Sequence, residues 1–217
     1  MLKIKLSFIL AAVFLYMPLN AVMTSDKALD RLMQGNQDYI MGNFRVTNRA
    51  AEEERRRQIS VYGQNPFAAI LGDSDSRSAP EIIFNKGIGD IFVVRTSGGI
   101  AGNDQIASLE FAIDHLGVPL VMVLGHTQYG VVNAAISGTR ERGALGRLLR
   151  NIARPVRRKT DAIPEDERFE RGMILHIEHT VRTVKASRRI KAAMKEGRVE
   201  VVGAIHNIRT GEVRLLK

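Results

Sequence analysis

The chain has 217 residues, of which 45% are hydrophobic, and this is enough for one domain with a sizeable core. The formal net charge of +9 favours anionic partners, whether small anions, nucleic acid or a membrane surface. The sequence has no cysteine, which excludes disulfides, thiolate catalysis and every zinc site that uses sulfur.

Residues 1–21 have the pattern of a secretory signal peptide. Lysines near the start precede an apolar run that is too short to span a bilayer comfortably, and Ala21 suits a cleavage site. We therefore predict a single mature domain over 22–217, which is periplasmic or secreted and has no stable membrane anchor after cleavage. The alternative is an uncleaved N-terminal anchor.

The mature chain begins with two predicted helices. Ser25 or Asp26 caps a helix that runs to about Met41, with its apolar residues on one face. A second helix over 50–62 is very charged, and its simplest interpretation is a solvated or interface helix. A turn before Pro66 then leads into the first strand.

Strands and helices alternate over the rest of the chain. The apolar run over 66–71 is predicted as the first strand because it is short, buried in character and followed by glycine. The later elements are a short helix from Ala79, strands over 91–94, 120–124 and 199–205, helices over 103–115, 130–136, 140–159 and 169–195, and a terminal hairpin strand over 212–216. This order predicts an α/β fold with a parallel sheet and right-handed crossovers.

Polar side chains follow two of the predicted strands. Asp73, Asp75 and Arg77 come after the first strand, and His126 comes after the strand over 120–124. Because ligands of parallel sheets bind beyond the carboxyl ends of the strands, we expect these four side chains to meet at one site.

The motifs around these residues carry a resemblance to a known family. The stretch from Gln64 to Ala135 closely resembles the β-class carbonic anhydrases, especially the bacterial secreted type. The matching motifs are Gly63-Gln64-Asn65-Pro66, Leu71-Gly72-Asp73-Ser74-Asp75-Ser76-Arg77, Pro80-Glu81-Ile82-Ile83-Phe84, Gly87 to Arg95 and Ser108 to Gly117. Arg31 to Asn36, Val201 to Ala204 and Thr210 to Val213 extend the resemblance to nearly the whole mature chain.

The resemblance implies a fold and an assembly. The expected fold is a mostly parallel central β-sheet flanked by helices, with an antiparallel C-terminal edge strand. The family is built on dimers in which the N-terminal helices embrace the partner, so a homodimer is expected. The implied reaction is the hydration of CO2 to bicarbonate at a zinc ion.

The departure from the family falls on the metal ligands. The resemblance places two cysteines and one histidine on the zinc, and the cysteine positions are Asp73 and Tyr129 here, while His126 remains. A phenol binds zinc only after losing its proton, and its usual pKa is near 10. We therefore expect the zinc site to be lost, with little or no CO2 hydration and no cofactor. We also hypothesise that Asp73, His126 and Tyr129 form a metal-free polar network.

The resemblance also implies an anion-binding shell. Asp75 and Arg77 correspond to a catalytic dyad near the metal-bound water, and Gln64 and Arg77 to groups that contact substrate. We expect them to retain a pocket for bicarbonate or another small anion. A structural salt bridge between Asp75 and Arg77, and an ordinary turn role for Gln64, are equally compatible with the sequence.

Two alternatives stay open at this stage. One is an active carbonate dehydratase that uses no metal or an altered metal site, with Asp73, Asp75 and His126 holding zinc or a harder divalent ion. The other is a structural or interaction dimer with a basic surface.

Two further features have simpler interpretations. The basic stretch over 140–159 has no interleaved aromatic residues, so a solvated face is favoured and nucleic acid binding is not expected. His176 and His179 lie three residues apart on a predicted helix, but no third ligand is nearby, so surface histidines are favoured.

Overall fold

A computed structural model describes residues 23–44, 49–161 and 163–216. Its centre is a five-stranded sheet in the order β2-β1-β3-β4-β5. The strands are β1 (Ala68–Gly72), β2 (Ile91–Arg95), β3 (Leu120–His126), β4 (Glu200–His206) and β5 (Val213–Leu215). The first four are parallel and β5 pairs antiparallel with β4, which confirms the predicted fold class.

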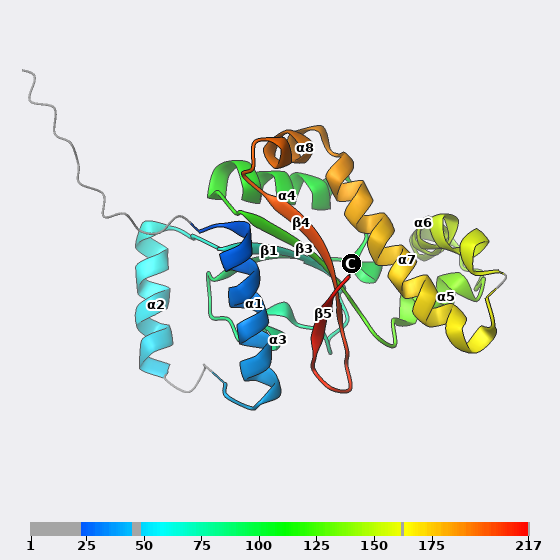
Figure 1. The fold of residues 1–217 in the computed structure, drawn as a ribbon, viewed down its shortest axis with the longest axis horizontal. Coiled ribbons are helices and arrows are strands. Elements are labelled where there is room, and N and C mark those ends of the chain that lie inside the picture. The colour runs from blue at the N-terminus through cyan, green and yellow to red at the C-terminus, as the bar shows by residue number, and fades with distance from the viewer. Residues whose placement is uncertain (1–22, 45–48, 162, 217) are drawn as a thin grey trace, which may run out of the picture.

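Helices cover both faces of the sheet (Figure 1). One face carries α1 (Ser25–Ile40) and α3 (Pro80–Ile83). The other carries α4 (Asn103–Leu116), α5 (Gly130–Ile136), α6 (Gly143–Thr160), α7 (Glu165–Ala186) and α8 (Arg188–Lys195). The remaining helix, α2 (Arg49–Tyr62), stands beside α1 and away from the sheet in Figure 1.

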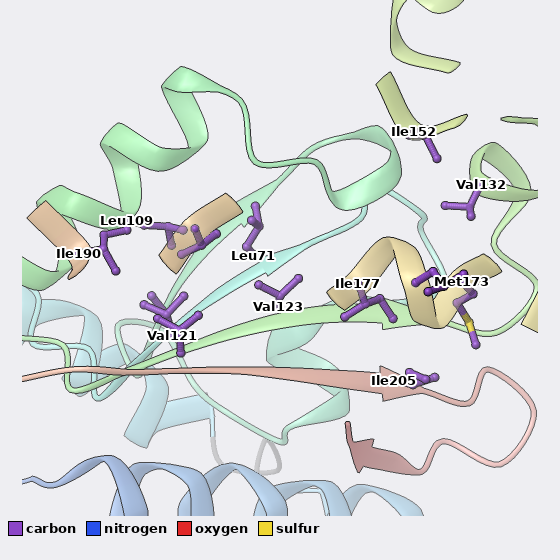
Figure 2. Packing of buried hydrophobic residues seen from close by; sticks show 14 of the residues in the cluster. Leu71, Leu109, Val121, Val123, Val132, Ile152, Met173, Ile177, Ile190 and Ile205 are labelled. Carbon is purple, nitrogen blue, oxygen red and sulfur yellow. The ribbon is translucent and has the colours of Figure 1, made fainter. Parts of the chain in front are cut away.

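The central strands are apolar on both faces, and alternate residues enter separate cores. Ala69 and Leu71 of β1 pack toward α4 and the helices that follow it, in the cluster drawn in Figure 2. Ala68 and Ile70 of the same strand pack toward α1 and α3. All five residues of β1 and all seven of β3 are buried, as expected for strands covered on both sides.

Two details of the predicted helices are wrong. The first helix is capped by the Thr24 hydroxyl, which accepts a hydrogen bond from the Lys27 backbone N–H, rather than by Ser25 or Asp26. The helix predicted over 169–195 is broken at Ser187, whose backbone is extended.

The helix breaks at Ser187 because the side chain of this residue makes two hydrogen bonds outside the regular helix pattern. Its hydroxyl accepts from the Ile190 backbone N–H, which starts α8, and donates to Glu110 Oε1 of α4 at 2.5 Å. Apolar periodicity continues across this break and therefore gave no sign of it.

The sheet register sets the position of the candidate site. Gly72 at the end of β1 lies beside Arg95 of β2 and Leu124 of β3, and His126 lies beside His206 of β4. Four strands therefore end at one edge, where the residues that follow β1 and β3 meet.

The predicted signal peptide over 1–21 lies outside the described residues. Within the part of the chain that the structure describes, no helix has the length and apolar character needed to cross a membrane.

Asn36 ties the N-terminal helix to two distant segments. Its side chain is fully buried and donates to the Ile83 and Gly211 carbonyl oxygens at 2.9 and 2.8 Å. Its Oδ1 accepts from the Val213 backbone N–H at 2.8 Å. The preceding Gly35 lets the helix approach, since a Cβ there would lie 1.9 Å from the Phe84 carbonyl oxygen. The Gly-Asn pair is therefore structural.

The first prediction concerns this contact. Asn36→Ala should lower the free energy of unfolding by about 3 kcal/mol, because it leaves two carbonyl oxygens and one N–H buried without partners. Urea unfolding measures the change. The matched control is Gln34→Ala on the exposed side of α1, which should change the free energy by less than about 0.5 kcal/mol. Equal losses in the two variants would contradict the role assigned to Asn36.

Candidate functional site

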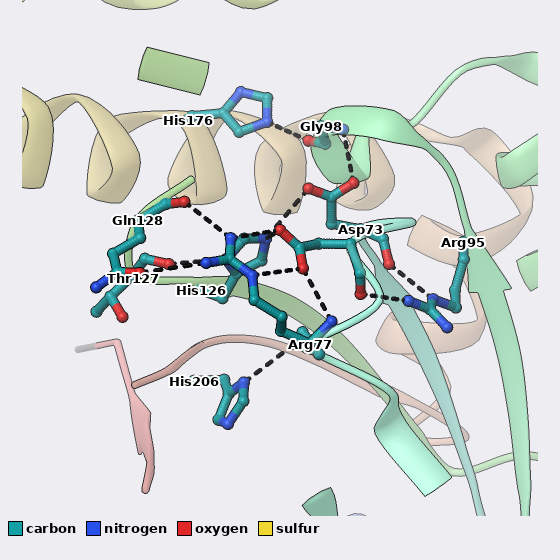
Figure 3. A network of polar contacts seen from close by, with 11 residues as sticks. Asp73, Arg77, Arg95, Gly98, His126, Thr127, Gln128, His176 and His206 are labelled. Carbon is teal, nitrogen blue, oxygen red and sulfur yellow. Dashed lines mark hydrogen bonds and ion pairs between the residues drawn. The ribbon is translucent and has the colours of Figure 1, made fainter. Parts of the chain in front are cut away.

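The predicted site residues gather at the carboxyl edge of the sheet (Figure 3). Asp73 and Asp75 follow β1, and His126 is the last residue of β3. Arg77 lies over Asp75, and Tyr129 packs beside His126 as the residue that precedes α5. The structure thus brings together every predicted site residue except Gln64.

Asp73 and His126 form a buried pair at the centre of this cluster. Asp73 Oδ2 lies 3.1 Å from His126 Nε2, and the two side chains are 8% and 0% exposed. His126 Nδ1 lies 2.8 Å from the Thr127 carbonyl oxygen, which can only accept, so Nδ1 carries a hydrogen. Nε2 faces the Asp73 carboxylate, so a hydrogen bond between the two side chains requires one proton between these atoms.

Neighbouring backbone groups hold Asp73 in place. Its Oδ1 accepts from the Gly98 N–H at 3.0 Å. Arg95, the last residue of β2, donates from Nε to the Asp73 carbonyl oxygen and from Nη2 to the Asp75 carbonyl oxygen, at 2.7 and 2.6 Å. These contacts fix both the side chain and the loop that carries it.

Asp75 and Arg77 form a bidentate ion pair. Arg77 Nε donates to Oδ1 at 2.9 Å and Nη2 donates to Oδ2 at 2.7 Å. The hydrogen bond from the Arg77 side chain holds the pKa of Asp75 well below its usual range. Arg77 Nη1 also donates to Gln128 Oε1 at 3.2 Å, and Gln128 has a left-handed backbone with φ of 56°. The sequence analysis did not assign Gln128 to the site. Its position two residues after the end of β3 was the feature that could have indicated it.

Tyr129 fills the space beside His126. The side chain is 2% exposed, and the two ring centroids are 4.2 Å apart. Its hydroxyl lies over Gly99, where a Cβ would be only 2.8 Å away. Burial, together with the charges of Asp73 and Asp75, raises the pKa of the Tyr129 phenol well above its usual value.

The polar network that we hypothesised from the sequence therefore has a different form. Asp73 and His126 form the expected hydrogen bond. Among the hydrogen bonds of the described residues, none involves the Tyr129 hydroxyl, so Tyr129 contributes by packing.

The burial of two histidines near the cluster was not predicted from the sequence. His206 is 1% exposed, and its Nδ1 lies 3.1 Å from Ser78 Oγ. His176 is 2% exposed, so its expected surface position is wrong. Its Nε2 lies 2.6 Å from the Gly98 carbonyl oxygen. The sequence pattern could not separate it from an exposed histidine, because the residues that cover it come from distant segments.

Gln64 lies elsewhere in the chain. It precedes β1 and is exposed, whereas Asp73 follows β1, so the strand separates the two residues. Within one chain they lie at opposite ends of β1, Gln64 at its amino end and Asp73 at its carboxyl end. A role for Gln64 in substrate binding therefore requires a second subunit and stays a prediction.

The zinc ion that the family resemblance implies does not fit these side chains. Nε2 of His126 lies within hydrogen-bond distance of Asp73 Oδ2, and the raised pKa of the buried Tyr129 phenol keeps its proton in place. At the two positions where the resemblance implies cysteines, Asp73 supplies a carboxylate that contacts His126, and Tyr129 supplies a ring that packs beside it. Across residues 23–44, 49–161 and 163–216, no group of three or more His, Cys, Asp or Glu side chains is arranged to hold a metal ion.

Comparison with known proteins shows what this architecture is similar to. The sequence model described as carbonic anhydrase matches residues 68–213, which is more than half of the chain. The carbonic anhydrase 2 of Mycobacterium tuberculosis is 33% identical over 190 residues, covering 85% of this chain and 89% of that protein. The carbonic anhydrase of Mycolicibacterium smegmatis is 34% identical over 191 residues, with coverage of 85% and 89%.

Solved structures give the same picture. A Coccomyxa β-carbonic anhydrase in complex with acetazolamide is 27% identical with a TM-score of 0.66, covering 78% of this chain and 82% of that one. A tetrameric β-carbonic anhydrase from Sordaria macrospora is 28% identical with a TM-score of 0.68, covering 77% and 90%.

The second prediction concerns His206. Burial, followed by the positive charge of His126, lowers its pKa from 6.5 to about 4, so it is neutral in the folded chain at pH 5. The unfolded chain binds this proton below pH 6.5, so the stability that neutral His206 contributes is present above pH 6.5 and is lost as the pH falls toward 4. Between pH 7.5 and 5 this loss should be about 2 kcal/mol.

Urea unfolding of the parent protein and of His206→Gln at both pH values measures this contribution. The variant should lose about 2 kcal/mol less than the parent over the same interval. Asp75 does not interfere, because its pKa is lowered and it stays ionised throughout. Identical losses in the two proteins would show that His206 is not a neutral buried group.

Proposed function

The chain belongs to the β-carbonic anhydrase family, and we propose that it is a member whose zinc site has been replaced by a carboxylate–histidine pair, with little or no CO2 hydration activity. The supporting observation is the 3.1 Å distance between Asp73 Oδ2 and His126 Nε2, because a hydrogen bond between them uses the ring nitrogen that a metal would need.

Without zinc, the reaction has no strong nucleophile at neutral pH. Bound zinc generates hydroxide by lowering the pKa of water from 15.7 to about 7. His126 as a general base on water would supply only about 10²- to 10⁴-fold. Its Nε2 already faces Asp73 at hydrogen-bond distance, so even this route is obstructed.

We further propose that the protein keeps a pocket for bicarbonate or another small anion. Arg77 supports this role because its side chain remains 46% exposed although it is paired with Asp75. Gln64 would join this pocket only from the partner subunit of a homodimer. Assembly is supported by the tetrameric relatives from Sordaria macrospora.

Residues 22–217 form the single mature domain of the proposed protein, which is periplasmic or secreted once residues 1–21 are removed. This part of the proposal depends on the N-terminal sequence pattern alone.

The third prediction tests whether Asp73 and Tyr129, at the two expected cysteine positions, prevent zinc binding. The parent protein, purified without added metal, should contain far less than one zinc per chain and should hydrate CO2 at the background rate in stopped-flow measurements. The double variant Asp73→Cys with Tyr129→Cys should bind about one zinc per chain and raise the rate at least about 100-fold, because two thiolates and His126 restore a three-ligand site.

The matched control is the double variant Asp73→Ser with Tyr129→Phe, which removes the same two side chains without supplying thiolates. It should stay inactive and free of zinc. A parent protein with one tightly bound metal ion and hydration above background would contradict the proposal. It would favour the alternative in which Asp73, Asp75 and His126 hold the metal.

A second candidate function follows from the surface of α6. Five arginines on this helix are exposed, and each lies three or four residues from another of the five, which places them on one side of it. They are Arg147, Arg150, Arg154, Arg157 and Arg158. In the described part of the chain none of the five forms an ion pair, whereas Arg31, Arg55 and Arg198 all pair with acids. This basic surface suits adsorption to an anionic lipid surface.

The fourth prediction concerns this basic surface. Arg147→Gln with Arg158→Gln should weaken binding to vesicles that contain phosphatidylglycerol by roughly 30-fold, at about 1 kcal/mol per charge. Vesicle sedimentation at low and high salt measures this. The control Arg56→Gln with Arg188→Gln removes the same charge from exposed positions elsewhere and should have a smaller effect. Equal effects of the two variants, or binding that is independent of salt, would contradict a role for α6.

A further inference from the structure

We propose that Gln128 is an internal competitor of the anion at Arg77. Its side-chain and backbone carbonyl oxygens occupy the edge of the guanidinium that a planar anion such as bicarbonate would bind, so the Gln128 side chain limits the affinity of the pocket. This inference rests on the proposed anion pocket at Arg77. It adds the residue that sets the affinity there and the class of anion that fits.

A guanidinium has two edges at which a pair of N–H groups can bind a pair of oxygen atoms, and in Arg77 both edges are occupied. The side edge, formed by Nε and Nη2, donates to the two carboxylate oxygens of Asp75 at 2.9 and 2.7 Å. The outer edge, formed by Nη1 and Nη2, donates to Oε1 and to the backbone carbonyl oxygen of Gln128 at 3.2 and 3.4 Å (Figure 3). Gln128 therefore places two oxygens where a carboxylate or bicarbonate would place its own.

The two edges of Arg77 are not held equally firmly. Attraction between opposite charges adds to the hydrogen bonds of Asp75, which also accepts from the Arg77 backbone N–H at 2.9 Å. Gln128 is neutral, and its contacts with Arg77 are longer. An incoming anion therefore displaces Gln128 and leaves Asp75 in place.

The side chain of Gln128, and not its backbone, is the part that can move. The backbone φ of 56° lies in the left-handed region, which glutamine rarely adopts. The preceding residue is fixed to the end of β4, since the Thr127 N–H donates to the His206 carbonyl oxygen at 2.9 Å and the Thr127 hydroxyl accepts from the Ile208 N–H at 3.1 Å. The backbone carbonyl oxygen therefore stays near Arg77, and only the longer-reaching amide is free to leave.

The displaced side chain has space to enter. Gln128 is exposed and lines a cavity of about 640 Å³ beside the C-terminal hairpin. The lining of this cavity includes the polar residues Asn133, Asn207 and Glu212. An amide that leaves Arg77 therefore enters a polar environment, and no buried packing has to be broken.

The arrangement also defines the class of anion. A planar group with two oxygens on one carbon can take the outer edge of Arg77 with two parallel hydrogen bonds, as bicarbonate and short carboxylates do. A single-atom anion such as chloride cannot make this paired contact. The pocket should therefore prefer bicarbonate to chloride.

The fifth prediction concerns bicarbonate binding near pH 8, measured by NMR titration of the Arg77 Nε–H signal, which is assigned by its absence in Arg77→Lys. Gln128→Gly removes the competing amide and suits the left-handed backbone, so it should bind bicarbonate about 10-fold more tightly than the parent protein. Gln128→Glu places a charged carboxylate on the same edge and should weaken binding at least about 10-fold. Chloride should bind more weakly than bicarbonate to the parent and to Gln128→Gly.

Gln37→Glu is the matched control, because it adds the same charge at an exposed position of α1 and should leave the affinity within about twofold. Opposite effects of the two Gln128 variants support competition, whereas a purely structural role would shift both in the same direction. Equal affinities of the parent and both Gln128 variants would overturn the role of Gln128 and leave the anion pocket standing. If even Gln128→Gly bound no bicarbonate, the proposed pocket itself would be wrong, and this inference with it.

Discussion

The contact between Asp73 and His126 is the interaction on which the rest of the site depends. Both side chains are buried, so a charge on either one alone would be costly, and each offsets the desolvation of the other. Asp73 in turn fixes Gly98, and Arg95 holds the backbone on both sides of Ser74. Removing one partner would leave a buried, unpaired polar group.

The Gly35-Asn36 motif and the central strands serve the fold rather than the chemistry. Gly35 and Asn36 join α1 to α3 and to the C-terminal hairpin, and no part of that joint touches the Asp73 cluster. Strands β1 and β3 are buried on both faces whether or not a metal is bound at their ends. The fold is therefore compatible with Asp73 and Tyr129 at the two positions where the family resemblance implies cysteines.

Much of this could be predicted from the sequence. Apolar runs and motif spacing gave the sheet and placed Asp73, Asp75, Arg77 and His126 at one edge, because strand direction alone fixes where such residues gather. The break at Ser187 was missed, since it depends on a contact with another helix. Partners distant in sequence likewise decide the burial of individual side chains. Local periodicity carries no information about them.

The position of Tyr129 has a consequence for any attempt to rebuild a thiolate site here. Its ring fits between His126 and Gly99, so replacing Tyr129 by cysteine alone would open a cavity costing roughly 3 kcal/mol. Replacing Asp73 alone would leave His126 without its partner. Each single replacement by cysteine is therefore unfavourable by itself. Placing thiolates at both positions requires the two substitutions to be made together.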